Sequence, residues 1–265
     1  MSKVEVLISA MHQSDFSIME RTNVHTDALL INQCDQNSLV EEARSYGRLR
    51  CISTTERGLS RSRNMALKNA KGSYCLICDD DEILYSGYEK EIEKAYEAYP
   101  DADLICFQIK REGKKYADKP CRIRYLKSLR IGSCQITMKP DSVLRKNISF
   151  DANFGSGTPV GSGEENIFLF DCLKNKLKIY YVPVCIGEVS QTNSNWFKGF
   201  TEEYFFNRGI IINRMMGKGM GSLYALYFAI SKYKRYKNNL SFANAVSKLF
   251  QGMRKNGRGK KLYAY

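Results

Sequence analysis

The sequence predicts an α/β fold, a mostly parallel β-sheet flanked by helices, followed by a C-terminal helical extension. Two features predict the sheet. Short apolar runs alternate with segments of helical periodicity in the first part of the chain, and polar clusters directly follow several of these runs. A third feature, an excess of basic residues in the last quarter, separates a predicted main domain (1–190) from a basic, aromatic-rich helical region (191–265).

The apolar runs predict the strands. The first, Val4–Ser9, contains one acid, Glu5. Strands that alternate with helices run parallel, so their carboxyl ends meet at one edge of the sheet, where such sheets bind ligands. The other predicted strands are Ala28–Ile31, Leu49–Ile52, Ser73–Cys78, Asp103–Ile109, Cys134–Met138 and Lys178–Val184.

Capping residues and apolar periodicity predict the helices. The clearest is Ser86–Tyr99, which has Ile92, Ala95 and Tyr96 on one face and Pro100 directly after it. The segment Arg111–Arg130 is polar and basic, and we expect a hairpin or a loop there. The other predicted helices are Ser14–Asn23, Ser60–Ala70, Pro140–Lys146 and one that begins at Glu164.

Composition indicates a cytoplasmic protein. The nine cysteines have no regular spacing, and several lie in apolar runs, which favours buried free thiols in a reducing compartment over a disulfide framework. No uncharged apolar run reaches the roughly 18 residues that a membrane-spanning helix needs. Peripheral attachment to the inner face of the plasma membrane stays open, because the C-terminal region is strongly basic.

Three adjacent acids, Asp79, Asp80 and Asp81, directly follow the predicted strand Ser73–Cys78. Neighbouring carboxylates repel one another and contribute nothing to a core. A divalent cation, alone or together with ribose hydroxyls, would relieve the repulsion. The run therefore predicts a metal and nucleotide site, and the alternative is a solvated acidic turn.

The segment Glu56–Asn64 predicts a second site. Gly58 precedes a helix that a serine would cap, which leaves backbone N–H groups open to an anion. Arg57, Arg61 and Arg63 could add contacts to phosphate. The alternative is a helix with a solvated arginine face. A phosphate site beside a cation site suits a nucleoside diphosphate.

Two acids, Glu164 and Glu165, follow the glycine-rich loop Asn153–Gly163 at a predicted helix start. A carboxylate in this position is well placed to act as a general base, and the helix dipole favours its ionised form. The alternative is an ordinary pair of first-turn acids that stabilises the helix.

These three elements, in this order and at these spacings, resemble bacterial family 2 glycosyltransferases, which are inverting enzymes of the GT-A fold. The resemblance covers roughly Val4 to Val184 and rests on Gly58–Asn64, on Asp79–Asp81 and on Gly161–Glu165. It implies transfer of a hexosyl or N-acetylhexosaminyl group from a nucleotide sugar, most often a UDP-sugar. The acceptor would be a hydroxyl of a cell-surface polysaccharide or of a lipid-linked glycan.

The resemblance also implies roles for single residues. Asp81 would ligate Mg²⁺ or Mn²⁺ at the diphosphate, Asp79 would hold the ribose or base region, and Asp35 would contact the nucleobase. The full set that would bind the nucleotide sugar is Asp35, Arg57, Arg63, Asn64, Asp79 and Asp80.

The chain departs from the family pattern at two places. The family usually has Glu-Asp where this chain has Glu164-Glu165. The second position is normally the base, so we expect Glu165 to be the base and Glu164 to support it. Many relatives also have a histidine after the last strand, and this chain has none there, so Glu188 is the expected substitute metal ligand. The metal could also have fewer protein ligands, since Mg²⁺ commonly keeps several waters.

Residues 195–265 have a formal charge balance of +12, against +1 for the rest of the chain. Aromatic residues mixed with these bases favour an anionic membrane surface as partner. The alternative is that the helices pack on the main domain and the bases are solvated. The basic run Arg254–Lys261 comes with no recognition motif, so we do not expect nucleic acid as a partner.

Two other functions stay open from the residues alone. A nucleotidyltransferase of similar fold would release pyrophosphate instead of a nucleoside diphosphate. A non-catalytic basic module would bind membrane or nucleic acid in a salt-sensitive manner and would not respond to nucleotide sugars.

Overall fold

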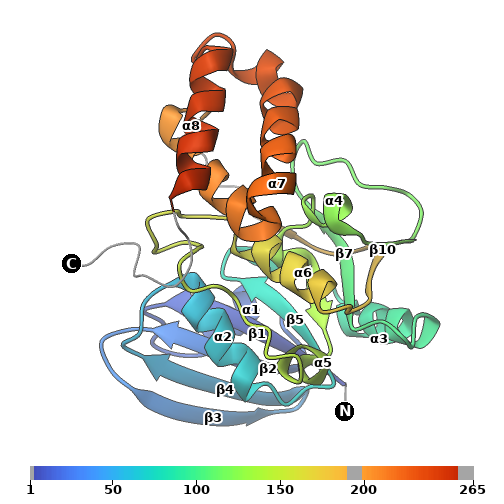
Figure 1. The fold of residues 1–265 in the computed structure, drawn as a ribbon. Helices are drawn as coiled ribbons and strands as arrows, with labels where there is room; N and C mark the ends of the chain where they lie inside the picture. Colours follow the sequence, from blue (N-terminus) through green and yellow to red (C-terminus); the bar gives the residue numbers. More distant parts are fainter. Residues whose placement is uncertain (1–2, 190–198, 256–265) are drawn as a thin grey trace.

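Four parallel strands form the first half of the sheet. In the computed structural model, which describes residues 3–189 and 199–255, they are β1 (Val4–Met11), β2 (Asp27–Gln33), β4 (Gly47–Thr54) and β5 (Tyr74–Asp79). β1 lies between β2 and β5, and β2 also pairs with β4. Their carboxyl ends therefore meet at one edge, as the sequence predicts (Figure 1).

The second half of the sheet is mixed. β9 (Ile136–Met138) lies antiparallel between β5 and β7 (Leu104–Lys110). β10 (Ile179–Val189) runs parallel to β7 and antiparallel to two short strands, β6 (Glu82–Leu84) and β8 (Cys121–Arg122). The strand β3 (Ser38–Arg44) pairs antiparallel with β4.

The complete strand order is β3-β4-β2-β1-β5-β9-β7-β10-β6, with β8 paired to β10. The α/β fold class is confirmed, although the sheet contains more antiparallel pairing than the sequence suggested. β3, β6 and β8 are strands that the sequence did not predict. All of β3 is exposed or half-buried, so its side chains show no apolar pattern.

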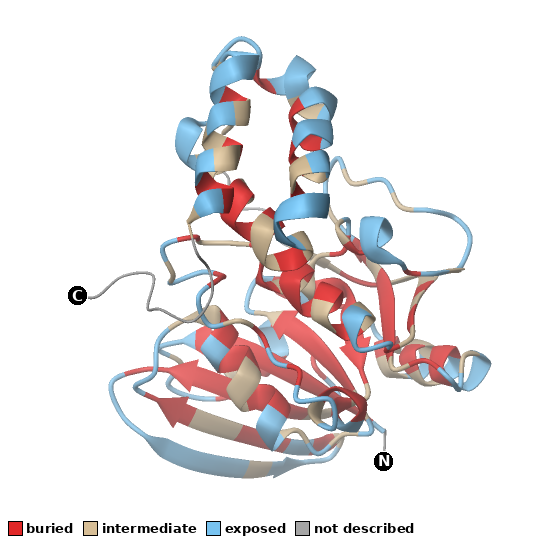
Figure 2. Ribbon diagram, viewed as in Figure 1, coloured by how far each residue is buried: buried red, intermediate tan, exposed pale blue. Residues whose placement is uncertain are grey.

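Helices cover both faces of the sheet. On one face, α1 (Ser17–Arg21) and α3 (Tyr88–Ala98) pack against alternate residues of β1, such as Val6 and Ile8. On the other face, α2 (Leu59–Asn69), α5 (Pro140–Leu144) and α6 (Glu164–Lys174) pack against the intervening side chains, such as Leu7. Buried residues therefore fill the sheet itself, as Figure 2 shows.

The segment between β7 and β9 is only partly as predicted. The region Arg111–Arg130 contains β8 and the short helix α4 (Tyr125–Ser128) in addition to loop. The predicted strand Cys134–Met138 begins with a 3₁₀ turn over Ser133–Gln135, so only its second part pairs as β9.

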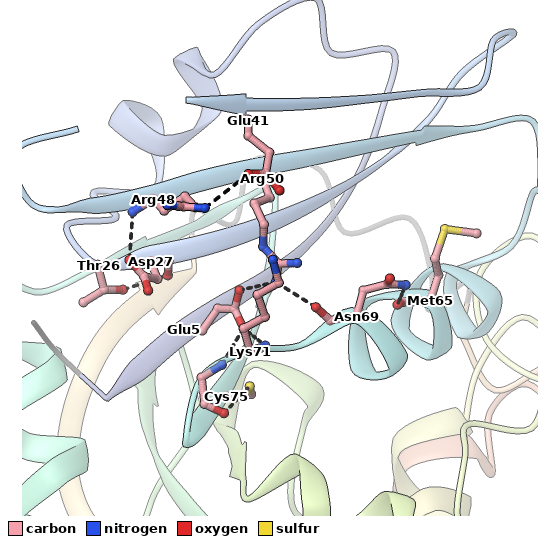
Figure 3. Close-up of polar contacts among 11 residues, drawn as sticks. Glu5, Thr26, Asp27, Glu41, Arg48, Arg50, Met65, Asn69, Lys71 and Cys75 are labelled. Carbon is pink, nitrogen blue, oxygen red and sulfur yellow. Dashed lines mark hydrogen bonds and ion pairs between the residues drawn. The ribbon is translucent and has the colours of Figure 1, made fainter. Parts of the chain in front are cut away.

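An acid in the first strand ties the amino-terminal end of the sheet together. The carboxylate of Glu5 is buried and forms a 2.6 Å ion pair with Arg50 of β4. It also accepts hydrogen bonds from the backbone N–H groups of Lys71 and Gly72, while Arg50 donates to the carbonyl of Asn69 (Figure 3). Both members of this buried ion pair therefore have further hydrogen bonds to the backbone, which help to offset the cost of burying the charges.

The C-terminal region forms two helices, α7 (Glu202–Tyr236) and α8 (Phe242–Arg254). Gly217 has a positive φ of 69° and a non-helical ψ, and it divides α7 into two halves. The first half packs on α6, where Ile210 and Ile211 join Ile167 and Phe170 in one apolar cluster. α8 packs against both halves, and the second half of α7 projects with it away from the sheet (Figure 1).

None of the helices in residues 3–189 and 199–255 is both long enough and apolar enough to cross a bilayer. The nine cysteines are all free. Most of the basic run Arg254–Lys261 lies outside the described residues.

Candidate active site

A buried arginine organises the carboxyl-terminal edge of the sheet. Arg63 lies on α2 with 3% of its side chain exposed, and it donates to two carboxylates from distant parts of the chain. Its Nη2 is 2.7 Å from Oδ1 of Asp79 at the end of β5, and its Nη1 is 2.9 Å from Oε1 of Glu164 at the start of α6. Burial alone would lower the pKa of Arg63, but the two carboxylates raise it, so the guanidinium stays charged.

The three acids of the triplet have different environments. Burial works against ionisation of Asp79, yet Arg63 holds the pKa of Asp79 below its usual value. Ser133 donates to its second oxygen at 3.2 Å. Asp80 and Asp81 form the turn after β5 and are exposed, and neither is ion-paired with another described residue. Partial burial and the charge of Asp79 raise the pKa of both.

A fourth acid, Glu82, belongs to this cluster and was missed in the sequence. Its side chain is fully buried, Oε1 has no hydrogen-bond partner, and Oε2 accepts a 3.4 Å bond from the backbone N–H of Asp79. Burial and then the charge of Asp79 raise the pKa of Glu82 well above its usual value. The alternation of β6 could have signalled it, because Glu82 and Leu84 point inward while Ile83 is exposed.

Glu165 is half-buried in the first turn of α6, next to the ion-paired Glu164. Burial, followed by the negative charge of Glu164, raises the pKa of Glu165 to about 8. The helix dipole was expected to keep this carboxyl ionised, and burial outweighs it. Two cations oppose the shift, Arg63 and Arg208 of α7. A carboxyl with a pKa near neutrality can accept a proton efficiently.

Two cations near Glu165 were not predicted from the sequence. Arg208 lies in the first half of α7, with its guanidinium 5.6 Å from the ring centroid of Tyr204 and 5.5 Å from that of Phe228. Lys114, in the loop after β7, donates to Oε1 of Gln135, and burial followed by the charge of Arg111 lowers its pKa to about 8. The charges of Arg208 and Lys114 both interact with that of Glu165. Only the folded chain brings these segments together.

The predicted anion site at the start of α2 is already filled by the protein. The N–H of Gly58 donates to Gln33, and the N–H of Leu59 donates to the carbonyl of Ser156. Ser60 does not cap the helix, because its hydroxyl donates to the carbonyl of Phe154. The glycine-rich loop therefore docks where an open phosphate cradle was expected.

The structure does bring Asp35 and Arg57 together. They follow β2 and β4, and Nη2 of Arg57 is 2.6 Å from Oδ1 of Asp35. Arg57 also donates to the carbonyls of Cys34 and Thr54, which fixes it at the carboxyl ends of both strands. Because β2, β4 and β5 end at the same edge of the sheet, the pair lies at the edge where the acidic triplet also lies. The side chain of Asp35 is 89% exposed there.

Two other predicted site residues are engaged within the fold. The side-chain amide of Asn64 donates to the carbonyl of Phe150 and accepts from its N–H, at 2.8 and 2.7 Å. Glu188, on β10, accepts from Tyr85 at 2.9 Å and from Lys110 at 3.2 Å. These hydrogen bonds, with Tyr85 first, lower the pKa of Glu188.

Exposed oxygen ligands are present for a divalent cation, but a complete protein cage is not. Burial and then the charge of Asp79 raise the pKa of both Asp80 and Asp81, and the charge of Asp80 adds to the shift at Asp81, so a nearby cation would stabilise their ionised forms. Within residues 3–189 and 199–255, no three His, Cys, Asp or Glu side chains are grouped so that they could hold a metal ion. Such a site fits a cation that keeps waters and shares a bound diphosphate, as Mg²⁺ usually does.

Solved structures share this fold. A crystal structure of a segment of S. aureus TarS in complex with UDP-GlcNAc aligns over 94% of this chain and 81% of its own, with 13% identity and a TM-score of 0.65. A mannosyltransferase from Pyrobaculum calidifontis, in complex with GDP-Man and Mn²⁺, aligns over 95% of this chain and 74% of its own, with 10% identity and a TM-score of 0.52. At these identities the likeness shows the fold alone.

The sequence comparisons give the family. No curated protein sequence matches this chain. The sequence profile described as "Glycosyl transferase family 2" matches residues 9–158, which include α2 with Arg63 and the acidic triplet at the end of β5. The chain belongs to glycosyltransferase family 2.

Proposed function

We propose that this glycosyltransferase moves a hexosyl or N-acetylhexosaminyl group from a nucleotide sugar to an acceptor hydroxyl, with inversion at the anomeric carbon. The observation that supports it most is Glu165, a half-buried carboxyl with a pKa raised to about 8. It lies beside the network of Arg63, Asp79 and Glu164 at the carboxyl ends of the strands.

The donor would bind along the edge formed by the ends of β2, β4 and β5. Asp35 and Arg57 would contact the base and ribose region, and Asp79 and Asp80 would border the sugar nucleotide. Arg63 would act indirectly, by holding the carboxylate of Asp79 in place. We propose a UDP-sugar as donor, which suits the UDP-GlcNAc held by the TarS structure, while the mannosyltransferase structure holds GDP-Man.

Asp81 would ligate Mg²⁺ or Mn²⁺, with Asp80 and water nearby. Glu188 would join only by giving up its hydrogen bonds to Tyr85 and Lys110. When bound, the cation would neutralise charge on the departing nucleoside diphosphate.

Glu165 would accept the proton of the acceptor hydroxyl. The oxygen would attack the anomeric carbon on the face opposite the leaving group, so a single displacement would invert the configuration. Glu164 cannot easily serve as the base, because its Oε1 is paired with Arg63. Its role would be to orient the start of α6. The acceptor would be a surface polysaccharide or a lipid-linked glycan.

Product analysis tests this function. The full chain is incubated with a panel of nucleotide sugars, Mn²⁺ and polysaccharide or lipid-linked glycan acceptors, and nucleoside diphosphate and pyrophosphate are measured separately. Release of nucleoside diphosphate with at least one donor is expected, and Asp81→Asn should lower that release by about 100-fold or more, because metal-bridged charge stabilisation is lost. The matched control is Asp141→Asn on α5, which should keep wild-type turnover.

Pyrophosphate as the product would indicate a nucleotidyltransferase instead. No thermal shift with any nucleotide sugar, with or without Mn²⁺, would contradict donor binding altogether.

A further inference from the structure

The second half of α7 exposes an apolar face. Met220, Leu223, Tyr227 and Ile230 have between 63% and 68% of their surface exposed. Their spacing of three and four residues places them on one side of the helix. Leu226 and Tyr233 border this face and are 38% and 43% exposed. We call these six residues the α7 stripe.

The α7 stripe is not the packing face of the helix. The opposite side of the same segment contains the buried residues Gly221, Ala225 and Ala229. Ala225 and Ala229 share an apolar cluster with Ala245 and Leu249 of α8, and Gly221 faces Met253 of the same helix. A helix that is apolar on two sides normally has a partner on both. Contiguous exposed apolar surface of this kind marks a binding surface for a protein or a membrane.

The charge around the α7 stripe has a single sign. The chain contains no Asp or Glu from Tyr204 to its last residue. Lys218, Lys234, Arg235 and Lys237 lie on or just beyond the same helical segment and are exposed, and none is ion-paired with another residue of the described chain. The surface is therefore apolar along its centre and cationic at both ends.

The stripe is also accessible to a flat surface. The turn at Gly217 directs the second half of α7 away from the sheet, and the pair formed with α8 projects from the rest of the molecule (Figure 1). Figure 2 shows exposed residues on the outer side of this pair and buried ones between its helices. At the end of the stripe, the ring of Tyr233 lies 6.0 Å from that of Phe242 of α8, while Met220, Leu223, Tyr227 and Ile230 stay more than 60% exposed in the described structure.

We propose that the α7 stripe binds the surface of an anionic lipid bilayer. The apolar side chains would enter the boundary between headgroups and acyl chains, and the flanking lysines and arginine would lie at lipid phosphates. Tyrosine suits this depth because its ring is apolar and its hydroxyl stays at the polar layer. A second copy of the chain fits less well, since two cationic faces would meet without any carboxylate to pair them.

Vesicle flotation tests the proposal without any nucleotide sugar, so its outcome is independent of the proposed transfer reaction. The full chain is mixed with vesicles of phosphatidylglycerol and phosphatidylcholine, or of phosphatidylcholine alone. Binding to the anionic vesicles is expected, with at least about tenfold weaker binding to the neutral ones. The double variant Leu223→Ser/Ile230→Ser should lose at least about tenfold in partitioning.

Matched control variants distinguish binding through the α7 stripe from non-specific binding through other exposed apolar or basic residues. Leu39→Ser/Val40→Ser replaces two exposed apolar residues of β3, and Lys68→Gln/Lys90→Gln removes two exposed charges from α2 and α3. Both should float like the wild type, whereas Lys234→Gln/Lys237→Gln should bind more weakly. Equal flotation of the stripe variant and the wild type would overturn the proposal. So would a stable dimer, seen by light scattering without vesicles, that Leu223→Ser/Ile230→Ser converts to a monomer.

Discussion

Nη1 of Arg63 lies 2.9 Å from Oε1 of Glu164, and the two residues are 101 positions apart in the sequence. The same guanidinium bonds Asp79 at 2.7 Å. One buried cation therefore joins α2, β5 and α6, and it fixes the first turn of α6, where Glu165 follows directly. The proposed base therefore directly follows a residue that this ion-pair network holds in place.

Arg63→Ala should destabilise the fold. It leaves the carboxylates of Asp79 and Glu164 without their shared partner, and breaking a buried pair typically costs about 3 to 5 kcal/mol. Because Asp79 is partly exposed, with 27% of its side chain accessible, we expect the lower end of that range. Denaturant unfolding measures the change in the free energy of unfolding. The value for Arg63→Lys should lie between those of Arg63→Ala and the wild type. A loss below about 1 kcal/mol would contradict the role of this network.

Transfer should depend on pH through Glu165. Its pKa is raised to about 8, so the protonated, inactive form dominates below that pH and the rate should rise with pH to a plateau above it. Glu164→Gln removes a neighbouring negative charge and frees Arg63, and both changes lower the pKa of Glu165. The midpoint of the rate profile should therefore move to lower pH. A midpoint that stays in place or rises would contradict this assignment.

Arg208 of α7 should also influence the pH dependence of the transfer rate. Its positive charge lowers the pKa of Glu165, so Arg208→Ala should move the midpoint of the rate profile to higher pH. Arg208→Lys should keep the midpoint close to the wild-type value, because it keeps the positive charge. The control is Arg254→Ala, an exposed residue of α8. A change in rate without a change in midpoint would show that Arg208 acts otherwise.

Asn64→Ala should affect stability more than donor binding. The amide of Asn64 makes two hydrogen bonds with the backbone of Phe150, and their loss should cost about 1 to 3 kcal/mol of unfolding free energy. The KM for the donor should stay within about twofold of the wild-type value. Asn238→Ala, which changes an exposed residue, is the control. A large rise in KM with unchanged stability would instead support a direct contact with the nucleotide.

The sequence predicted the parallel half of the sheet well, because a short run rich in apolar residues marks each of its strands. β9 shows where such reasoning fails. It enters the sheet between β5 and β7, although it follows β7 in the chain, and only tertiary packing decides that order. β3 was missed because an exposed edge strand needs no apolar pattern.

The candidate site was predictable in composition but not in arrangement. The acidic triplet appears uniform in sequence, yet strand geometry turns Asp79 toward Arg63 while Asp80 and Asp81 face solvent. Glu82 continues the run and is buried, because β6 points it inward. Arg208 could not be assigned, since nothing in a basic C-terminal region indicates which single cation approaches Glu165.

Replacement of Glu165 by glutamine tests whether this carboxylate removes the acceptor proton. Donor binding and sugar transfer are measured for Glu165→Gln and Glu164→Gln beside the wild type, at a pH above 8. We expect Glu165→Gln to bind the donor normally and to lose transfer by about 100-fold or more, while Glu164→Gln retains most of it. Normal transfer by Glu165→Gln would show that another group removes the acceptor proton.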